Sequence, residues 1–208
     1  VAEALEVIAG ATEGAAVPDW LRWAGGAGET MPGKTTTFTV ELRPGRYYAV
    51  DMTSDEGTDP KLLAAQGAVK AIRVLKAEKP AKLPATSASI TATEYGFEAK
   101  RLTAGRNTVE LHNAGSEQHH FVLAPIIKNK TFNDVKRFAT SDEESGPPPV
   151  DFEGQFISGV IDGGKKQLMR LDLKVGRYAL FCFVSDRAGG PPHVTTGMLA
   201  ELAVRPRG

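Results

Sequence analysis

The sequence contains one cysteine, Cys182, and four histidines, and none of these histidines lies within the first 111 residues. A lone cysteine excludes an internal disulfide, so cysteine usage does not indicate the redox compartment. Thiolate and imidazole are the side chains that bind soft and borderline metals best. The first half of the chain therefore cannot hold a metal site built from such ligands.

Long apolar runs and an excess of charge are also missing. No run of about 18 apolar residues occurs, so no transmembrane segment is predicted in this chain. The 25 basic and 25 acidic residues balance, which gives no support for nucleic acid or an anionic membrane surface as partner. The first ten residues lack a start methionine and a basic leader region, so we expect that a leader was removed or that the chain starts partway into the gene product.

Glycine and proline are frequent, and runs of Val, Thr, Tyr and Phe recur between them, which favours an all-β fold for the 208 residues. Residues 131–138 predict a short helix, and residues 16–23 and 61–66 predict helical turns. Strands are predicted at residues 4–9, 35–42, 46–52, 68–75, 88–97, 107–112, 119–123, 167–173, 178–184 and 198–204.

An internal repeat organises the chain. The sequence PGRYYAVDM at residues 44–52 matches VGRYALFCF at residues 175–183, with Gly45 over Gly176. In this overlay Asp51 takes the place of Cys182, and Ala68 takes the place of Met198. The first copy therefore has the same scaffold without the candidate ligands.

The repeat predicts two domains, residues 1–78 and 87–208, joined at residues 79–86 within a segment rich in Lys, Ala and Pro. The second copy has a strand pair near residues 87–112 that the first copy lacks. We therefore expect further N-terminal residues that complete the first domain.

Residues 175–204 contain three candidate metal ligands. Cys182 lies in an apolar strand, His193 follows after ten intervening residues of a Gly- and Pro-rich loop, and Met198 follows after four more. Taken singly, each is more often a buried core residue. Together, a thiolate, an imidazole and a thioether around one loop suit a copper ion that cycles between Cu(I) and Cu(II), provided that a second imidazole is supplied.

The second imidazole lies in the sequence NAGSEQHHFVLAP, residues 113–125. Neighbouring side chains of a strand point to opposite faces, so only one of His119 and His120 can face a site between two sheets. His112, before the turn, is interpreted as a structural or surface residue.

This order of motifs resembles the blue-copper proteins, the cupredoxins, over residues 87–204. Asn-Ala-Gly precedes a histidine that enters a strand; then come YALFC, a histidine, Gly-Met and a last strand. The resemblance implies two cupredoxin-like Greek-key β-sandwich domains, the first N-terminally incomplete and without metal ligands. It favours His119 over His120, and so one mononuclear type 1 copper on His119, Cys182, His193 and Met198. The ten-residue gap from Cys182 to His193 is longer than in small carriers of the family.

Three functions follow from these residues. The first is an electron-transfer protein with one copper. The second, an enzyme such as a copper nitrite reductase or multicopper oxidase, is disfavoured because Phe181 and Phe183 flank Cys182 where such enzymes carry a histidine. The third is a copper-binding accessory or scaffold subunit of a larger membrane complex, or a copper storage or chaperone protein, which the ligand-free first copy supports.

The resemblance also implies where the protein works and what it contacts. Blue-copper proteins are typically exported, so we expect an extracytoplasmic location, periplasmic or at the cell surface and in association with a membrane. By the same resemblance the imidazole edge of His193 faces an apolar surface patch, where protein redox partners dock.

Overall fold

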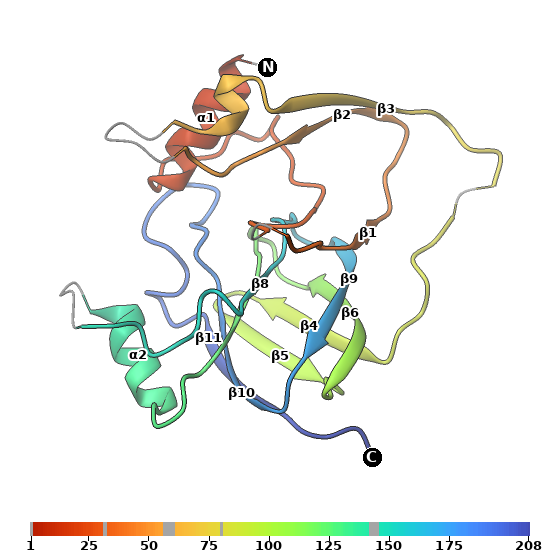
Figure 1. Ribbon diagram of the computed structural model, residues 1–208. Helices are drawn as coiled ribbons and strands as arrows, with labels where there is room; N and C mark the ends of the chain where they lie inside the picture. Colours follow the sequence, from red (N-terminus) through yellow and green to blue (C-terminus); the bar gives the residue numbers. More distant parts are fainter. Residues whose placement is uncertain (1, 31–32, 56–60, 80, 142–145) are drawn as a thin grey trace.

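The computed structural model describes residues 2–30, 33–55, 61–79, 81–141 and 146–208 (Figure 1). Its elements, in chain order, are α1 (Ala2–Thr12), β1 (Phe38–Val40), β2 (Gly45–Val50), the 3-10 helix η1 (Leu63–Gln66), β3 (Val69–Val74), β4 (Ala88–Thr93), β5 (Gly96–Lys100), β6 (Gly105–Asn113), β7 (Val122–Pro125), α2 (Phe132–Thr140), β8 (Phe156–Ile157), β9 (Lys166–Leu173), β10 (Gly176–Phe181) and β11 (Leu199–Val204). The expected all-β class is confirmed, with two short α-helices among the described residues. Neither helix has the length and apolar character that a bilayer crossing requires.

Two sheets form the sandwich. One has the strand order β1-β9-β6-β4-β5 and the other β11-β10-β7-β8; β4 and β6 are parallel and the remaining pairs antiparallel. Alternate residues of both sheets point into a shared core, which includes Leu111 and Leu171 of the first sheet and Leu123 and Leu180 of the second. Each such side chain contributes about 1.5–3 kcal/mol when fully buried.

α2 covers the outer face of the second sheet (Figure 1). The helix begins after Thr131, whose side chain accepts from the backbone N–H of Asp134, while the Asp134 carboxylate accepts from the backbone N–H of Thr131. This reciprocal pair satisfies two N–H groups that a helix start otherwise leaves without partners. Its buried Val135 packs beside Ala179 and Phe181 of β10. The helix expected at residues 131–138 is confirmed.

The strand expected at residues 4–9 is wrong, because these residues lie in α1. A short apolar run does not distinguish a strand from a buried helix. Here Ala4, Ile8 and Ala11 recur at the spacing of a helix face and pack in one cluster with the buried Val17 and Leu21. Ala, Leu and Glu, which dominate the segment, are strong helix formers.

Two other expectations change in detail. The strand expected at residues 88–97 is two strands, β4 and β5, separated by a turn at Glu94 and Tyr95. Residues 16–23 hold a turn, closed by Leu21 N–H on Pro18 O at 3.1 Å, and no helix. The helical turn expected at residues 61–66 is confirmed as η1.

The repeat is visible in the backbone. β2 pairs with β3 from Gly45↔Val74 to Val50↔Val69, and β10 pairs with β11 from Gly176↔Val204 to Phe181↔Leu199, which is the same register after the offset of the two copies. The loops that close the two hairpins also match, since Gly67 and Gly197 have φ values of 105° and 106°. Four backbone hydrogen bonds of the loop recur in both copies. In the first copy they join Asp51 N to Ala68 O (3.0 Å), Leu63 N to Thr53 O (2.8 Å), Ala64 N to Asp51 O (2.9 Å) and Ala68 N to Leu63 O (2.9 Å). In the second copy the corresponding bonds join Cys182 N to Met198 O (3.3 Å), His193 N to Val184 O (2.9 Å), Val194 N to Cys182 O (2.8 Å) and Met198 N to His193 O (2.9 Å).

The surroundings of the two hairpins differ. β10 lies between β11 and β7 and faces the sandwich core, whereas β2 and β3 form a separate two-stranded sheet, which lies beside α1 at the top of Figure 1. β1, from the first copy, pairs with β9 of the second. The boundary expected at residues 79–86 and the two-domain organisation stay predictions.

Tyr178 and Tyr47 occupy matching positions in the repeat, and the hydroxyl of each binds the backbone of the residue four positions earlier. The Tyr178 hydroxyl donates to Lys174 O and accepts from Lys174 N–H, each at 3.1 Å, and the Tyr47 hydroxyl donates to Arg43 O at 2.9 Å. Such hydrogen bonds fix the chain at the start of the strand that contains the tyrosine. Tyr178 is buried, whereas Tyr47 is partly exposed.

We expect Tyr178→Phe to lower the free energy of unfolding by about 1 kcal/mol, because it removes two backbone links from a buried site. Tyr47→Phe is the matched control and should have a smaller effect, since water can replace its single bond. Urea denaturation of the wild type and both variants measures this difference. Equal effects of the two substitutions would contradict the assignment of Tyr178 to the core.

Candidate metal centre

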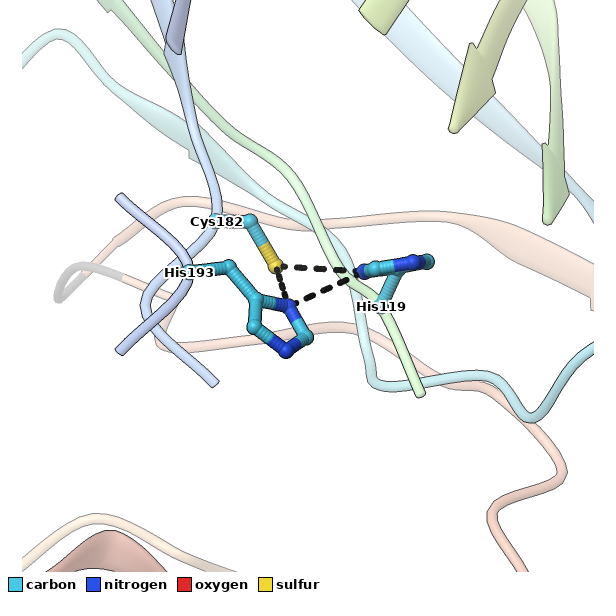
Figure 2. A group of neighbouring side chains, drawn as sticks. All are labelled: His119, Cys182 and His193. Atoms are coloured by element: carbon cyan, nitrogen blue, oxygen red, sulfur yellow. Dashed lines mark hydrogen bonds between the residues drawn. The ribbon is translucent and has the colours of Figure 1, made fainter. Parts of the chain in front are cut away.

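Three buried side chains from distant parts of the chain point toward one another at one end of the sandwich (Figure 2). The Nδ1 atoms of His119 and His193 lie 3.1 Å apart, and the Sγ atom of Cys182 lies 3.8 Å from the first and 3.5 Å from the second. His119 and Cys182 have no exposed surface, and His193 is 1% exposed. The structure thus brings together three of the four residues that the sequence singles out, through their metal-binding atoms.

Cys182 and His193 are held by the loop between β10 and β11. Cys182 follows the last residue of β10, and its N–H and C=O bind Met198 O and Val194 N–H. His193 is tied at both backbone groups, to Val184 O and to Met198 N–H. The loop between the two ligands can therefore be long while the ligands themselves stay fixed.

His119 is positioned from the other side of the site. Its backbone forms two hydrogen bonds with Ile161, at 3.1 and 2.9 Å. The buried Asn113 closes the preceding turn: its amide donates to Glu117 O and Ile161 O, and its Oδ1 accepts from Gly115 N–H. The Asn-Ala-Gly motif of the sequence is therefore the turn that aims His119 inward.

His120 lies outside the cluster. Its Nε2 accepts a hydrogen bond from the backbone N–H of Phe183 at 2.9 Å, and the residue lines a cavity of about 1140 Å³ that also borders Trp23, Asp51 and Phe183. Neighbouring residues of an extended chain point to opposite sides, so the placement of His119 in the cluster directs His120 away. His112, on β6, is partly buried and lies opposite Lys166.

Met198 is fully buried and packs with Cys182 and Ala92 in one small cluster. Gly197, in the left-handed region with φ 106°, turns the chain so that Met198 enters β11 beside the cysteine. A side chain at this φ would be strained. The Gly-Met pair of the sequence is therefore a turn followed by a residue adjacent to the cluster.

Burial favours the neutral forms of His119 and Cys182. Loss of solvent, with a smaller effect of the nearby His193, lowers the pKa of His119 to about 4. Loss of solvent also raises the pKa of the Cys182 thiol to about 12. The Nε2 of His119 and the Nε2 of Gln167 are the buried side-chain polar atoms without a partner among the described residues.

His193 is covered on its outer side, which corrects the expectation that its ring edge faces an apolar surface patch. Its Nε2 lies 2.9 Å from Oδ1 of Asp186, and the ring of Tyr95 meets the imidazole edge-on with centroids 5.4 Å apart. The hydroxyl of Tyr95 binds the same carboxylate. Tyr95, 40% exposed, is therefore the outermost group above this histidine.

Residues 14–28, named here the strap, cross the loops that carry the cluster. Gly14 O accepts from Gly190 N–H at 2.9 Å, and the Trp23 indole N–H donates to Gln118 Oε1 at 2.6 Å, next to His119. The Arg187 guanidinium donates to three strap carbonyls, those of Val17, Pro18 and Leu21, and pairs with Asp162 at 2.6 Å. The long segment between Cys182 and His193 thus provides the anchor for the strap.

The residues fit a metal ion. Metal bonds of about 2.0–2.3 Å to nitrogen and sulfur place three donors in a trigonal plane about 3.5–3.7 Å apart, and the separations found are 3.1, 3.5 and 3.8 Å. An ion at the centre would take one lone pair from each of the two Nδ1 atoms, which otherwise contact each other. Two imidazoles and a thiolate with a thioether nearby form the donor set that copper uses in electron-transfer sites.

No known family model matches the chain, and no curated protein matches its sequence. Several solved structures are similar, among them the following three. Auracyanin B is 20% identical, covering 61% of this chain and 93% of its own, with a TM-score of 0.39. The reduced auracyanin of Roseiflexus castenholzii is 20% identical, covering 57% and 95%, with a TM-score of 0.35. The copper protein rusticyanin is 17% identical, covering 56% and 76%, with a TM-score of 0.27. Likeness at this level carries no functional inference, so function is argued below from the site.

Glu94 joins the β4–β5 turn to the loop before His119. Its carboxylate accepts from the backbone N–H and the hydroxyl of Ser116 and from the N–H of Glu117. These bonds favour the charged form and lower the pKa of Glu94 from 4.5 to about 2. The stabilisation is therefore complete above the ordinary pKa of the unfolded chain and is lost as the pH falls toward 2.

We expect Glu94→Gln to lower the free energy of unfolding at neutral pH, and this deficit should shrink below about pH 4 and vanish near pH 2. Urea denaturation of both proteins across that pH range gives the difference. A deficit that stays constant with pH would show that the charge of Glu94 does not contribute.

Proposed function

We propose that the protein is a mononuclear type 1 copper protein that transfers single electrons. His119, Cys182 and His193 would hold the copper, and the thioether of Met198 would be the weak fourth ligand. The observation that carries the proposal is the buried triangle of two Nδ1 atoms and one Sγ atom. The buried thioether beside Cys182 favours copper over zinc, since zinc sites in proteins use Cys, His and carboxylate ligands.

Bound copper would supply a one-electron couple between Cu(I) and Cu(II). The chain supplies a rigid frame, because Cys182, His193 and Met198 belong to one hydrogen-bonded loop between two strands. Little movement of the ligands between the two oxidation states keeps the barrier to electron transfer low. The surrounding Ala92, Phe97 and Val184 exclude water from the thiolate, which is one of the factors that set the potential.

An electron-transfer role is preferred to an oxidase or reductase role for a chemical reason. A substrate-reducing copper enzyme needs a second metal wired to the first through a histidine next to the cysteine. Phenylalanines occupy both of these positions, and Phe183 is stacked on Phe181 with ring centroids 5.4 Å apart. These rings have no metal-binding atoms.

Location and partners follow from the same proposal. We propose an extracytoplasmic site of action, where exported blue-copper proteins work, and protein redox partners that dock near His193. The outermost groups there are Tyr95 and Asp186. A partner would therefore contact a phenol and a carboxylate above the imidazole.

We expect the purified protein loaded with Cu(II) to show an intense visible thiolate-to-copper band, and Cys182→Ser to lose it while remaining folded. The band requires a thiolate bound to Cu(II), so it tests the ligand directly. Visible absorption together with a metal count makes the measurement. A colourless protein with one copper, or no bound copper at all, would reject the type 1 site.

The two neighbouring histidines provide a matched control. His119→Gln should abolish or strongly shift the band, because it removes one corner of the triangle. His120→Gln should retain it, since the side chain of His120 binds Phe183 N–H and lies outside the cluster. The reverse result would assign the ligand to His120.

A second function, an accessory or scaffold subunit with bound copper, is favoured by one specific observation. The β2–β3 hairpin repeats the ligand loop without ligands and exposes Tyr48, Ile72 and Leu75, at 44%, 42% and 70%. Electrochemistry distinguishes the two functions. A fast, reversible one-electron couple supports the electron carrier, whereas slow electron exchange, with the copper passed on to a chelating acceptor, supports the storage or chaperone form of the alternative.

A further inference from the structure

The carboxylate of Asp186 is a charged group in direct contact with the cluster. Its Oδ1 lies 2.9 Å from Nε2 of His193. A carboxylate can only accept a hydrogen bond, so Nε2 carries the proton. The lone pair of Nδ1 then faces Cys182 Sγ at 3.5 Å and His119 Nδ1 at 3.1 Å. This is the tautomer that a metal at the centre of the triangle requires.

Asp186 is itself held in place. The hydroxyl of Tyr95 donates to its two oxygens, at 3.1 and 2.9 Å. Tyr95 adopts the left-handed backbone conformation, with φ 58°, which is uncommon for a bulky residue and costs about 1 kcal/mol or more. The neighbouring Glu94 anchors that turn to the loop before His119. The carboxylate is therefore fixed from a different sheet than the one that leads into the histidine.

The first copy provides an internal comparison. Asp55 matches Asp186 in the repeat, and Leu63 takes the place of His193. The carboxylate of Asp55 binds its own loop, accepting from Lys61 N–H and from the Gln66 amide, both at 2.7 Å. In the first copy, which has no imidazole, the carboxylate of Asp55 binds groups of its own loop. In the second copy the carboxylate of Asp186 binds the imidazole of His193. The contact is thus specific to the copy that has the ligands.

We propose that Asp186 is a positioning residue of the metal centre: it holds His193 in the tautomer that presents Nδ1 to the metal, and its negative charge favours the oxidised ion. The second half of this proposal rests on the proposed copper function. A ligand imidazole that donates its other N–H to a carboxylate becomes more basic and is held in one orientation. His119 has no such partner, because its Nε2 is unsatisfied among the described residues, so the effect is confined to one of the two imidazoles.

The first experiment uses the metal-free protein and is independent of copper. Nitrogen-15 NMR of the imidazoles should find His193 protonated at Nε2 in the wild type and in Asp186→Asn, whose side-chain oxygen still accepts. Asp186→Leu removes the acceptor and should give a mixture of tautomers. Protonation at Nδ1 in the wild type, or an unchanged tautomer in Asp186→Leu, overturns the positioning role.

The second experiment measures the reduction potential of the copper-loaded protein from its visible band. Asp186→Asn keeps the orientation and removes the charge, so the preference for Cu(II) over Cu(I) should fall about tenfold, which raises the potential by about 59 mV. Asp172→Asn, which removes one exposed carboxylate from β9, is the charge-matched control and should leave the potential unchanged.

The outcomes separate the two claims. An intact visible band with equal potentials for Asp186→Asn and Asp172→Asn overturns the electrostatic role of Asp186 and leaves the copper function standing. A wild-type protein without the band overturns the copper function and the electrostatic role that depends on it. The tautomer measured without metal then decides the positioning role alone.

Discussion

Two imidazole nitrogens face each other at 3.1 Å in a space without solvent, and the rest of this structure must hold them there. Buried polar groups are costly unless they find partners, and here the facing atoms find only each other and a neutral thiol. This unfavourable free energy is offset by the frame around the site. The frame consists of paired strands, the turn at the buried Asn113 and a loop whose backbone groups bind one another. The hydrogen bonds of this frame join backbone groups and the side chain of Asn113. They therefore do not depend on the side chains of His119, Cys182 and His193.

The two copies of the repeat separate the frame from the chemistry. The first copy forms the same hairpin register and the same loop hydrogen bonds. In it Asp51, Leu63 and Ala68 stand in place of Cys182, His193 and Met198. The loop conformation is therefore a property of the backbone pattern and its glycines, and it does not need a metal to form. Function in the second copy depends on a few side chains placed on a backbone that would fold without them.

Much of the site could be predicted from local sequence. The spacing of Cys182, His193 and Met198 around one loop is a local feature, and the repeat supports the strands on either side. The local Asn-Ala-Gly motif favours His119 over His120, but the pairing that holds His119 in place is with Ile161, 42 residues away. Asp186 lies inside the loop, but its importance depends on Tyr95, which reaches it from the β4–β5 turn.

Long-range contacts also explain what the sequence reasoning missed in the fold. The mainly apolar segment at residues 4–9, which includes Glu6, is compatible with a strand or a helix until the neighbours that bury it are known. β1, from the first copy of the repeat, pairs with β9 of the second, a partner that the sequence analysis does not predict. The cover over the site comes from residues 14–28, where the sequence predicts a helical turn at residues 16–23 and does not indicate the contacts with the ligand loop.

The anchoring of the strap has a consequence for the order of events during synthesis. Arg187 and the strap carbonyls that it binds are separated by 166 to 170 residues, so the strap leaves the ribosome long before its anchor exists. Contacts between segments this distant form late, because closing so large a loop costs entropy that only the finished structure repays. We therefore expect the ligand loop to be covered late, when the strap and Arg187 meet.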